Sequence, residues 1–116
     1  MVKRGEVYMA ELEPRSGSEQ RGRRPVIVIS HDAFNSVPSW SSLIVIPVSS
    51  SHKQKSRLNT SILLPQGAGG LSQESVALCH QITTLDRAKL GKRIGELGSE
   101  LMKHVEDGLL AAVSIM

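Results

Sequence analysis

Hydrophobic residues in the first 98 positions occur in short runs or in alternation with polar residues, and turn-forming residues separate the runs. Short apolar stretches between segments rich in Gly, Pro and Ser are typical of β-strands. The expected strands cover residues 7–12, 26–30, 43–48, 60–64 and 75–82. Within the third, Pro47 indicates an edge position or a bulge, because proline donates no hydrogen bond to a neighbouring strand.

The spacing of apolar residues changes after Ser99. Leu101, Val105, Leu109 and Val113 recur at helical intervals, with further apolar residues beside them. This pattern predicts a C-terminal amphipathic helix with Ser99 as its N-cap. Its apolar stripe should cover the sheet or a second subunit.

Three shorter features complete the local prediction. Residues 32–35 resemble a helical turn, the Gly-rich segment 67–70 a flexible turn, and Asp86 could cap a short turn over residues 87–90. Five or six short strands followed by one helix indicate a mainly β, α+β fold, a small and strongly curved antiparallel barrel with its helix added last. No repeat or linker divides the chain, so residues 1–116 are expected to form one domain.

Composition bears on the cellular compartment and on cysteine chemistry. The chain has no apolar run long enough to cross a bilayer and begins without the apolar segment of a secretory signal, which predicts a cytoplasmic protein. Cys79 is the single cysteine, so neither an internal disulfide nor a cysteine-based metal cluster can form within the chain. Its apolar neighbours indicate a buried structural thiol.

The charge points to an anionic partner. The net charge is +3 and the pI about 9.4. The only aromatic residues are Tyr8, Phe34 and Trp40, which argues against a protein that stacks many bases on an aromatic sheet.

Two polar, basic segments carry the candidate chemistry. The first, residues 17–25, contains Arg21, Arg23 and Arg24 and runs into the apolar strand at residue 26. Pro25 biases Arg24 toward extended geometry, which makes Arg24 the best positioned of the three. The second segment, residues 49–57, begins at the end of another strand. The alternative interpretation is that the arginines form a solvated hairpin tip.

If the two parent strands are neighbours, Arg24 and Ser49 can meet at one rim of the barrel. A fixed cation beside a hydroxyl suits a phosphodiester, because both can stabilise charge on the phosphate oxygens. RNA cleavage by the neighbouring 2′-hydroxyl would need no metal or other cofactor, since the nucleophile belongs to the substrate. His80 is the candidate general base. Its alternative role is that of a partly buried histidine bonded to a backbone carbonyl.

The other histidines lack the spacing of metal ligands and are expected at the surface. These are His31, His52 and His104.

Four segments together resemble the MazF/PemK/Kid family of bacterial toxins. They are residues 3–8 (KRGEVY), residues 17–26 (GSEQ followed by RPV), residues 47–50 (PVSS) and residues 81–86 (QITTLD). They span almost the whole chain in the family order.

The resemblance implies an SH3-like barrel, a homodimer and a metal-independent endoribonuclease that cleaves single-stranded RNA, including mRNA, leaving 2′,3′-cyclic phosphate and 5′-hydroxyl ends. It also implies a cognate antitoxin whose disordered C-terminal segment covers the RNA groove. By position, Arg24 matches the catalytic arginine and Ser49 the catalytic hydroxyl. The residues expected to contact RNA are Ser18, Glu19, Gln20, Arg21, Arg23, Ser50, Lys53, Lys55, Arg57 and Gln81.

The chain also departs from the family pattern. His80 stands where members carry Glu or Asp, Leu78 where some carry arginine, and Thr83 where many carry arginine. The base is therefore open, with His80 as the candidate. A second hypothesis is a non-catalytic toxin of the same fold that binds DNA gyrase or nucleic acid, in which the C-terminal helix would carry the gyrase contact.

Overall fold

Seven strands, two α-helices and three 3₁₀ turns make up the computed structural model, which describes residues 1–12, 22–50 and 59–114. No helix among these residues is long and apolar enough to cross a membrane. In chain order the elements are β1 (Glu6–Glu11), β2 (Arg23–Val28), α1 (Asp32–Asn35), β3 (Ser42–Ser49), β4 (Ser61–Leu64), η2 (Ala68–Gly70), β5 (Ser75–Leu78), η3 (Cys79–Gln81), β6 (Thr83–Asp86), η4 (Arg87–Lys89), β7 (Leu90–Glu96) and α2 (Ser99–Ala112).

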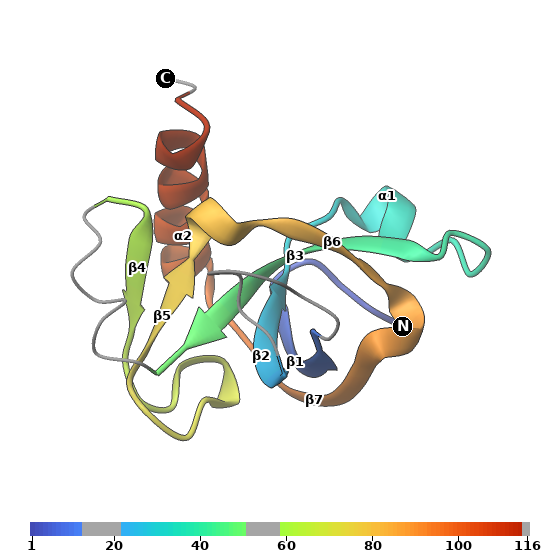
Figure 1. Ribbon diagram of the computed structural model, residues 1–116, viewed down its shortest axis with the longest axis horizontal. Helices are drawn as coiled ribbons and strands as arrows, with labels where there is room; N and C mark the ends of the chain where they lie inside the picture. Colours follow the sequence, from blue (N-terminus) through green and yellow to red (C-terminus); the bar gives the residue numbers. More distant parts are fainter. Residues whose placement is uncertain (13–21, 51–58, 115–116) are drawn as a thin grey trace.

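The strands form one antiparallel sheet in the order β4-β5-β3-β2-β1-β7, with β6 also paired to β3. Figure 1 shows that β3 runs through the centre of the molecule, with α2 standing beside β4 and β5 and α1 near the opposite end of β3. The mainly β fold with a C-terminal helix is as predicted.

The sheet curls strongly without closing. Leu85 of β6 and Leu90 of β7 come from opposite ends of the run β6-β3-β2-β1-β7, yet both pack in one apolar cluster with Val26 and Val45. A flat sheet would hold these ends far apart, so the strands must wrap around this cluster. A second apolar cluster, which includes Met102 and Val105 of α2, fills the space between the sheet and the helix.

The predicted strand 75–82 ends early: β5 covers only Ser75–Leu78, η3 turns the chain over Cys79–Gln81, and the next strand, β6, begins at Thr83, beyond the predicted bounds. Along the edge of β3 that does not face β2, Val45 pairs with Thr83 of β6, and further along Val48 pairs with Ala77 of β5. Pro47 faces the interval between them, where η3 turns the chain. Pro47 therefore does not mark an edge strand, because β3 is central; its missing N–H falls where the ladder beside it changes partners.

Strands β6 and β7 lie outside the predicted ranges, and together they bring the number of strands to seven. Strand β7 left the weaker signal. Its sequence is half exposed, with two glycines and three charged residues, so it shows little apolar alternation. Backbone contacts explain the glycines: a Cβ on Gly95 would lie 2.4 Å from the Gly69 carbonyl, and one on Gly70 1.7 Å from the Ile94 oxygen. The predicted turn at 67–70 is thus a 3₁₀ turn seated directly on β7.

Helix α2 was predicted, but its start and buried face differ in detail. Gly98, rather than Ser99, is the N-cap residue. The buried positions are Met102, Val105 and Gly108, whereas Val113, the C-cap residue, is about half exposed. The helix buries a narrower stripe than the spacing suggested, because it covers only one edge of the curled sheet.

The two short turns are as predicted. Helix α1 begins at Asp32, where Nδ1 of exposed His31 accepts a hydrogen bond from the Ala33 N–H. The Asp86 carboxylate accepts one from the Ala88 N–H and caps η4. His104 is also exposed, as predicted, whereas His52 lies outside the described residues.

Candidate functional site

Arg24 belongs to a strand rather than to a loop. Strand β2 begins at Arg23, three residues before the predicted start, because the pairs Ala10↔Arg24 and Glu11↔Arg23 extend its ladder with β1. The Arg24 side chain is exposed, but its backbone is fixed by pairing with β1, which restricts it more than the adjacent Pro25 alone would.

Ser49 is the last residue of β3 and pairs with Val76 of β5. Strands β2 and β3 are neighbours, and their register runs from Val28↔Val45 to Val26↔Pro47. Extending that register by two residues places Arg24 opposite Ser49. Ser49 is only 3% exposed, so it belongs to the sheet and not to the solvated segment that was expected to begin there.

A cavity of about 360 Å³ opens beside these strand ends. Arg24 and the exposed Ser50 line it together with polar residues of the segment that follows η2. Those further polar residues are Ser72, Gln73 and Ser75. Sequence reasoning missed all three, because a polar turn carries no pattern of its own; the neighbouring glycines are the one signal of close backbone packing there.

His80 lies in η3 and not in a strand, which corrects the prediction. It is half buried, and its Nε2 is 3.5 Å from Nε2 of Gln81. Among the described residues, the lining of the Arg24 cavity does not include His80.

The neighbouring Cys79 is buried, as predicted. Its Sγ lies 3.6 Å from the Val105 carbonyl oxygen, and burial raises the pKa of the thiol to about 11. A thiol with that pKa is a poor nucleophile at neutral pH, so Cys79 is part of the packing under α2.

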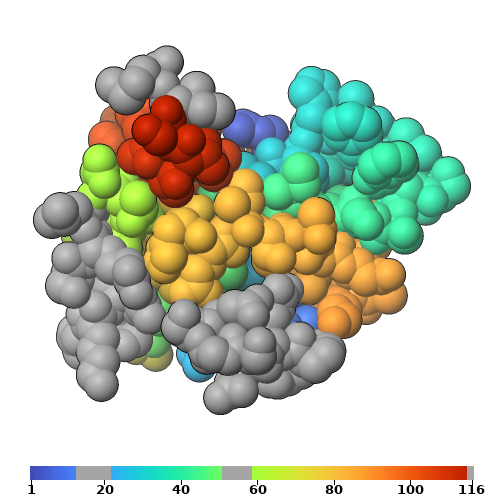
Figure 2. Space-filling view, turned by 45° about the horizontal axis from the view of Figure 1, so that its top comes forward, coloured from blue at the N-terminus to red at the C-terminus, as the bar shows by residue number. Residues whose placement is uncertain are grey.

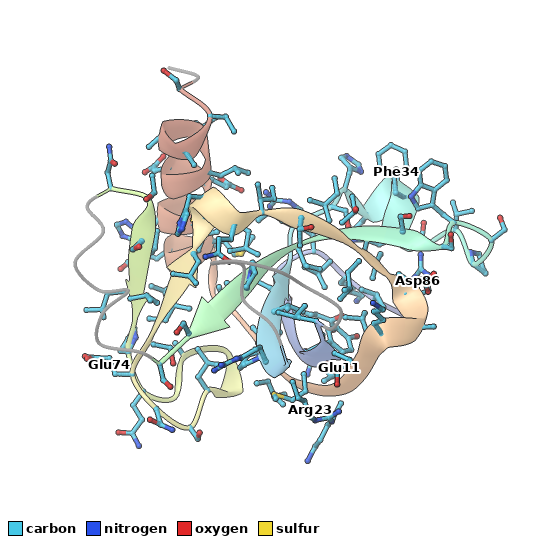
Figure 3. The ribbon with its side chains drawn as sticks, viewed as in Figure 1. Glu11, Arg23, Phe34, Glu74 and Asp86 are labelled. Atoms are coloured by element: carbon cyan, nitrogen blue, oxygen red, sulfur yellow. The ribbon has the colours of Figure 1, made fainter. Side chains whose placement is uncertain are left out.

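Arg23 extends away from β3. A Cβ on Gly91 of β7 would lie 3.2 Å from the Arg23 Nη2, so the guanidinium reaches across β1 toward β7. Figure 3 shows Arg23 and Glu11 at the same end of the molecule. The predicted cluster of arginines is thus divided, with Arg24 on the cavity and Arg23 over β7.

The remaining predicted RNA contacts lie outside the described residues. They are Ser18, Glu19, Gln20, Arg21, Lys53, Lys55 and Arg57. In the part of the chain that the structure describes, no group of three or more His, Cys, Asp and Glu side chains could hold a metal ion.

Two of the three aromatic residues stack at the surface. The rings of Phe34 and Trp40 are 5.4 Å apart, and the residues are 49% and 50% exposed. The Arg87 side chain holds this segment by donating hydrogen bonds to the carbonyl oxygens of Asn35, Val37 and Trp40. Figure 2 shows the segment around α1 projecting from one side of the molecule, so Trp40 is not a core residue.

Comparison with known proteins places these features in a family. The chain is 35% identical over its full 116 residues to endoribonuclease EndoA of Bacillus subtilis (strain 168), covering 97% of that protein. It also resembles an endoribonuclease in complex with its cognate antitoxin from a mycobacterial species, with 20% identity, a TM-score of 0.80, and coverage of 100% of this chain and 98% of that one.

A MazE–MazF structure from Deinococcus radiodurans is similar too, with 25% identity, a TM-score of 0.72, and coverage of 97% of this chain and 95% of that one. The family model for the PemK-like, MazF-like toxin of type II toxin–antitoxin systems matches residues 3–113. This chain therefore belongs to the PemK-like, MazF-like family of type II toxins.

Proposed function

We propose that this toxin is a metal-independent endoribonuclease that cleaves single-stranded RNA at short sequences, inhibiting translation and growth. Membership of the toxin family and the full-length similarity to an endoribonuclease support the activity. The observation that carries the site is the position of Arg24: it lies on β2, across from the Ser49 end of β3, and lines a cavity with Ser50.

In the proposed reaction, the 2′-oxygen of the substrate attacks the adjacent phosphorus. The new P–O2′ bond closes a cyclic phosphate, and the bond from phosphorus to the 5′-oxygen of the next nucleotide breaks. A base takes the proton from the 2′-hydroxyl, and the departing oxygen takes one from solvent to become a 5′-hydroxyl.

Arg24 and Ser49 act on the phosphate. The guanidinium remains charged and can donate two parallel hydrogen bonds to phosphate oxygens. Each donor aimed at the developing charge can contribute about 3–4 kcal/mol. Ser49 supplies a hydroxyl donor beside Arg24, and His80 is the candidate base.

The decisive experiment incubates purified protein with a long mixed-sequence RNA in EDTA. Products that end in a cyclic phosphate support the enzyme, whereas intact RNA favours the hypothesis of a non-catalytic binder. Arg24→Ala should lower the cleavage rate about 10²–10³-fold, and Arg24→Lys should fail as well, because a point charge cannot replace the planar fork. Lys103→Ala removes the same charge from exposed α2 and serves as the control. An Arg24→Ala protein that cleaves normally would refute this role.

Regulation is expected through a cognate antitoxin, because similar proteins have been solved with theirs. We propose that the antitoxin's C-terminal segment covers the RNA groove of a toxin homodimer in the cytoplasm. The proposed groove contacts include Gln81 and Ser50 with the residues of both basic segments. Light scattering of the purified toxin, alone and with the antitoxin, measures the stoichiometry directly.

A further inference from the structure

The cavity beside Arg24 has a floor made by four strands and a 3₁₀ turn. Its apolar lining comes from Met9 of β1, Pro25 of β2, Val48 of β3, Ile94 of β7 and Leu71, which follows η2. Its volume of about 360 Å³ lies at the small end of the usual range of ligand pockets. An apolar floor of this size suits a flat, weakly polar group.

The polar groups of the cavity come from the segment 72–75 and from the ends of two strands. Ser72, Gln73 and Ser75 line it on the side of β5, while Arg24 and Ser50 line it at the ends of β2 and β3. The amide of glutamine and the hydroxyl of serine can each donate and accept a hydrogen bond. Such groups recognise the polar edge of a base, whose faces are apolar.

The segment after η2 is held in place before any ligand binds. The Gly67 N–H donates to the Leu71 carbonyl, and Nε2 of Gln66 donates to that of Ser72. The Ser75 hydroxyl donates to the Gln73 carbonyl, while Gly70 packs on the backbone of Ile94. A rigid wall loses little conformational entropy on binding and can therefore discriminate between ligands.

We propose that this cavity is a nucleobase subsite, in which one base adjoining the phosphate held by Arg24 is inserted and read by the segment 72–75. The inference rests on the proposed function for the identity of the ligand, since single-stranded RNA is commonly recognised by splayed bases whose edges are hydrogen-bonded. Ser72 and Gln73 would then help to determine which RNA sequence is cleaved, whereas contacts to the phosphate do not depend on the base.

Two variants test this role by cleavage mapping on a long mixed-sequence RNA. Ser72→Phe narrows the cavity, and Gln73→Ala removes an amide. Each should change the preference at one nucleotide position by about tenfold or more. Ser99→Phe, at the exposed start of α2, is the matched control and should leave the map unchanged. Thermal unfolding verifies that each variant is folded.

Methyl NMR gives a readout that needs no cleavage. The probes are 2′-O-methyl tetranucleotides of each of the four bases, which lack the nucleophilic hydroxyl. At least one should shift the Met9 methyl resonance, while that of Met102, which packs in the core by Gly5, stays in place. Ser72→Phe should abolish the Met9 shift.

The two proposals fail separately. Cleavage with an unaltered map in both variants, or with no Met9 shift from any probe, would overturn the subsite and leave the ribonuclease intact. A Met9 shift in a protein that cleaves no RNA would instead retain the base site and remove the enzymatic function. If Ser72→Phe alters only inhibition by the antitoxin, the cavity belongs to a protein partner and the nucleobase assignment is wrong.

Discussion

At the scale of single residues, the two central side chains of the candidate site, Arg24 and Ser49, differ in solvent exposure. Arg24 is exposed and can meet a substrate, whereas Ser49 is held almost entirely within the sheet. Ser50, one residue further, is exposed and lines the cavity. The site therefore has one buried hydroxyl, that of Ser49, and one exposed hydroxyl, that of Ser50. Kinetic measurements can distinguish their roles.

We expect Ser49→Ala to lower kcat about 10²-fold, the effect typical of a lost donor to the transition state. Ser50→Ala should mainly raise KM, because an exposed hydroxyl at the cavity rim contributes to binding of ground state and transition state alike. Single-turnover and steady-state cleavage of a short RNA substrate separate the two effects. A fall in kcat from Ser50→Ala, with none from Ser49→Ala, would transfer the catalytic role to Ser50.

The role of His80 can be tested by pH. If its imidazole takes the 2′-hydroxyl proton, His80→Gln should lower the cleavage rate about 10²-fold and flatten its dependence on pH between about 5 and 8. Cleavage rates of both proteins across that interval provide the comparison, with exposed His104→Gln as the control. A lower rate with an unaltered profile would make His80 a structural residue.

At the scale of elements, a glycine of α2 permits close packing of the helix against β4 and η3. Gly108 lies on the buried side of the helix, and a Cβ there would be 2.8 Å from Cγ1 of Ile62 and 2.9 Å from the Cys79 sulfur. The glycine weakens the helix locally but permits this contact. Helix propensity and packing thus act in opposite directions at this position.

We expect Gly108→Ala to destabilise the protein, although alanine is the better helix former. The propensity gain is about 1 kcal/mol, while forcing a methyl group into a filled core costs about 1–3 kcal/mol. Urea unfolding measures the net change, expected on the order of 1 kcal/mol. His104→Ala on the exposed side should instead stabilise by a few tenths of a kcal/mol. Equal stabilisation by both substitutions would show that the helix can move away from Ile62.

At the scale of the whole molecule, a buried carboxylate joins the beginning of the chain to its last strand. Glu6 of β1 accepts hydrogen bonds from the Lys3 N–H at 2.7 Å, the Tyr8 hydroxyl at 3.0 Å and Arg93 Nε of β7 at 2.6 Å. Burial by itself would raise the pKa of Glu6, but the hydrogen bonds from Arg93, Lys3 and Tyr8 outweigh it and lower the pKa. The ionised form therefore stabilises the fold.

A lowered pKa fixes the direction of the pH dependence. The stabilisation by Glu6 is complete above the pKa of the unfolded chain, about 4.3, and is lost as the pH falls through the lower pKa of the folded state. Glu6→Gln should cost about 1–3 kcal/mol at pH 7, because it disturbs a buried, satisfied group. Urea unfolding from pH 7 to 3 should show this difference shrinking toward acid. A difference that stays constant would mean that charge has no part in the contact.

Asp32 contributes in the same direction. The Arg4 N–H and the Asn35 amide donate hydrogen bonds to its carboxylate and lower its pKa. The acid sensitivity of the Glu6→Gln variant should therefore be reduced but not abolished, since Asp32 still titrates.

The sequence by itself determined what local patterns encode: the apolar strands around Val26 and Val45, the helical turn at 32–35, the cap at Asp86, the C-terminal helix, and the motifs that place the chain in its toxin family. Local preference and burial agree in these segments, so short windows suffice. Arg24 could likewise be chosen from the sequence as the candidate catalytic arginine, because it precedes Pro25 and a buried strand.

Only the tertiary structure decided which distant segments meet. Strand β7 exists because it pairs with β1, which lies at least 80 residues earlier in the chain, and because Gly95 admits the turn at Gly70. The turn at η3 lies where the partner of β3 changes from β5 to β6, and the Gln73 side of the cavity depends on the curl of the sheet. Such pairings gain their free energy from contacts between distant residues, which no local window contains.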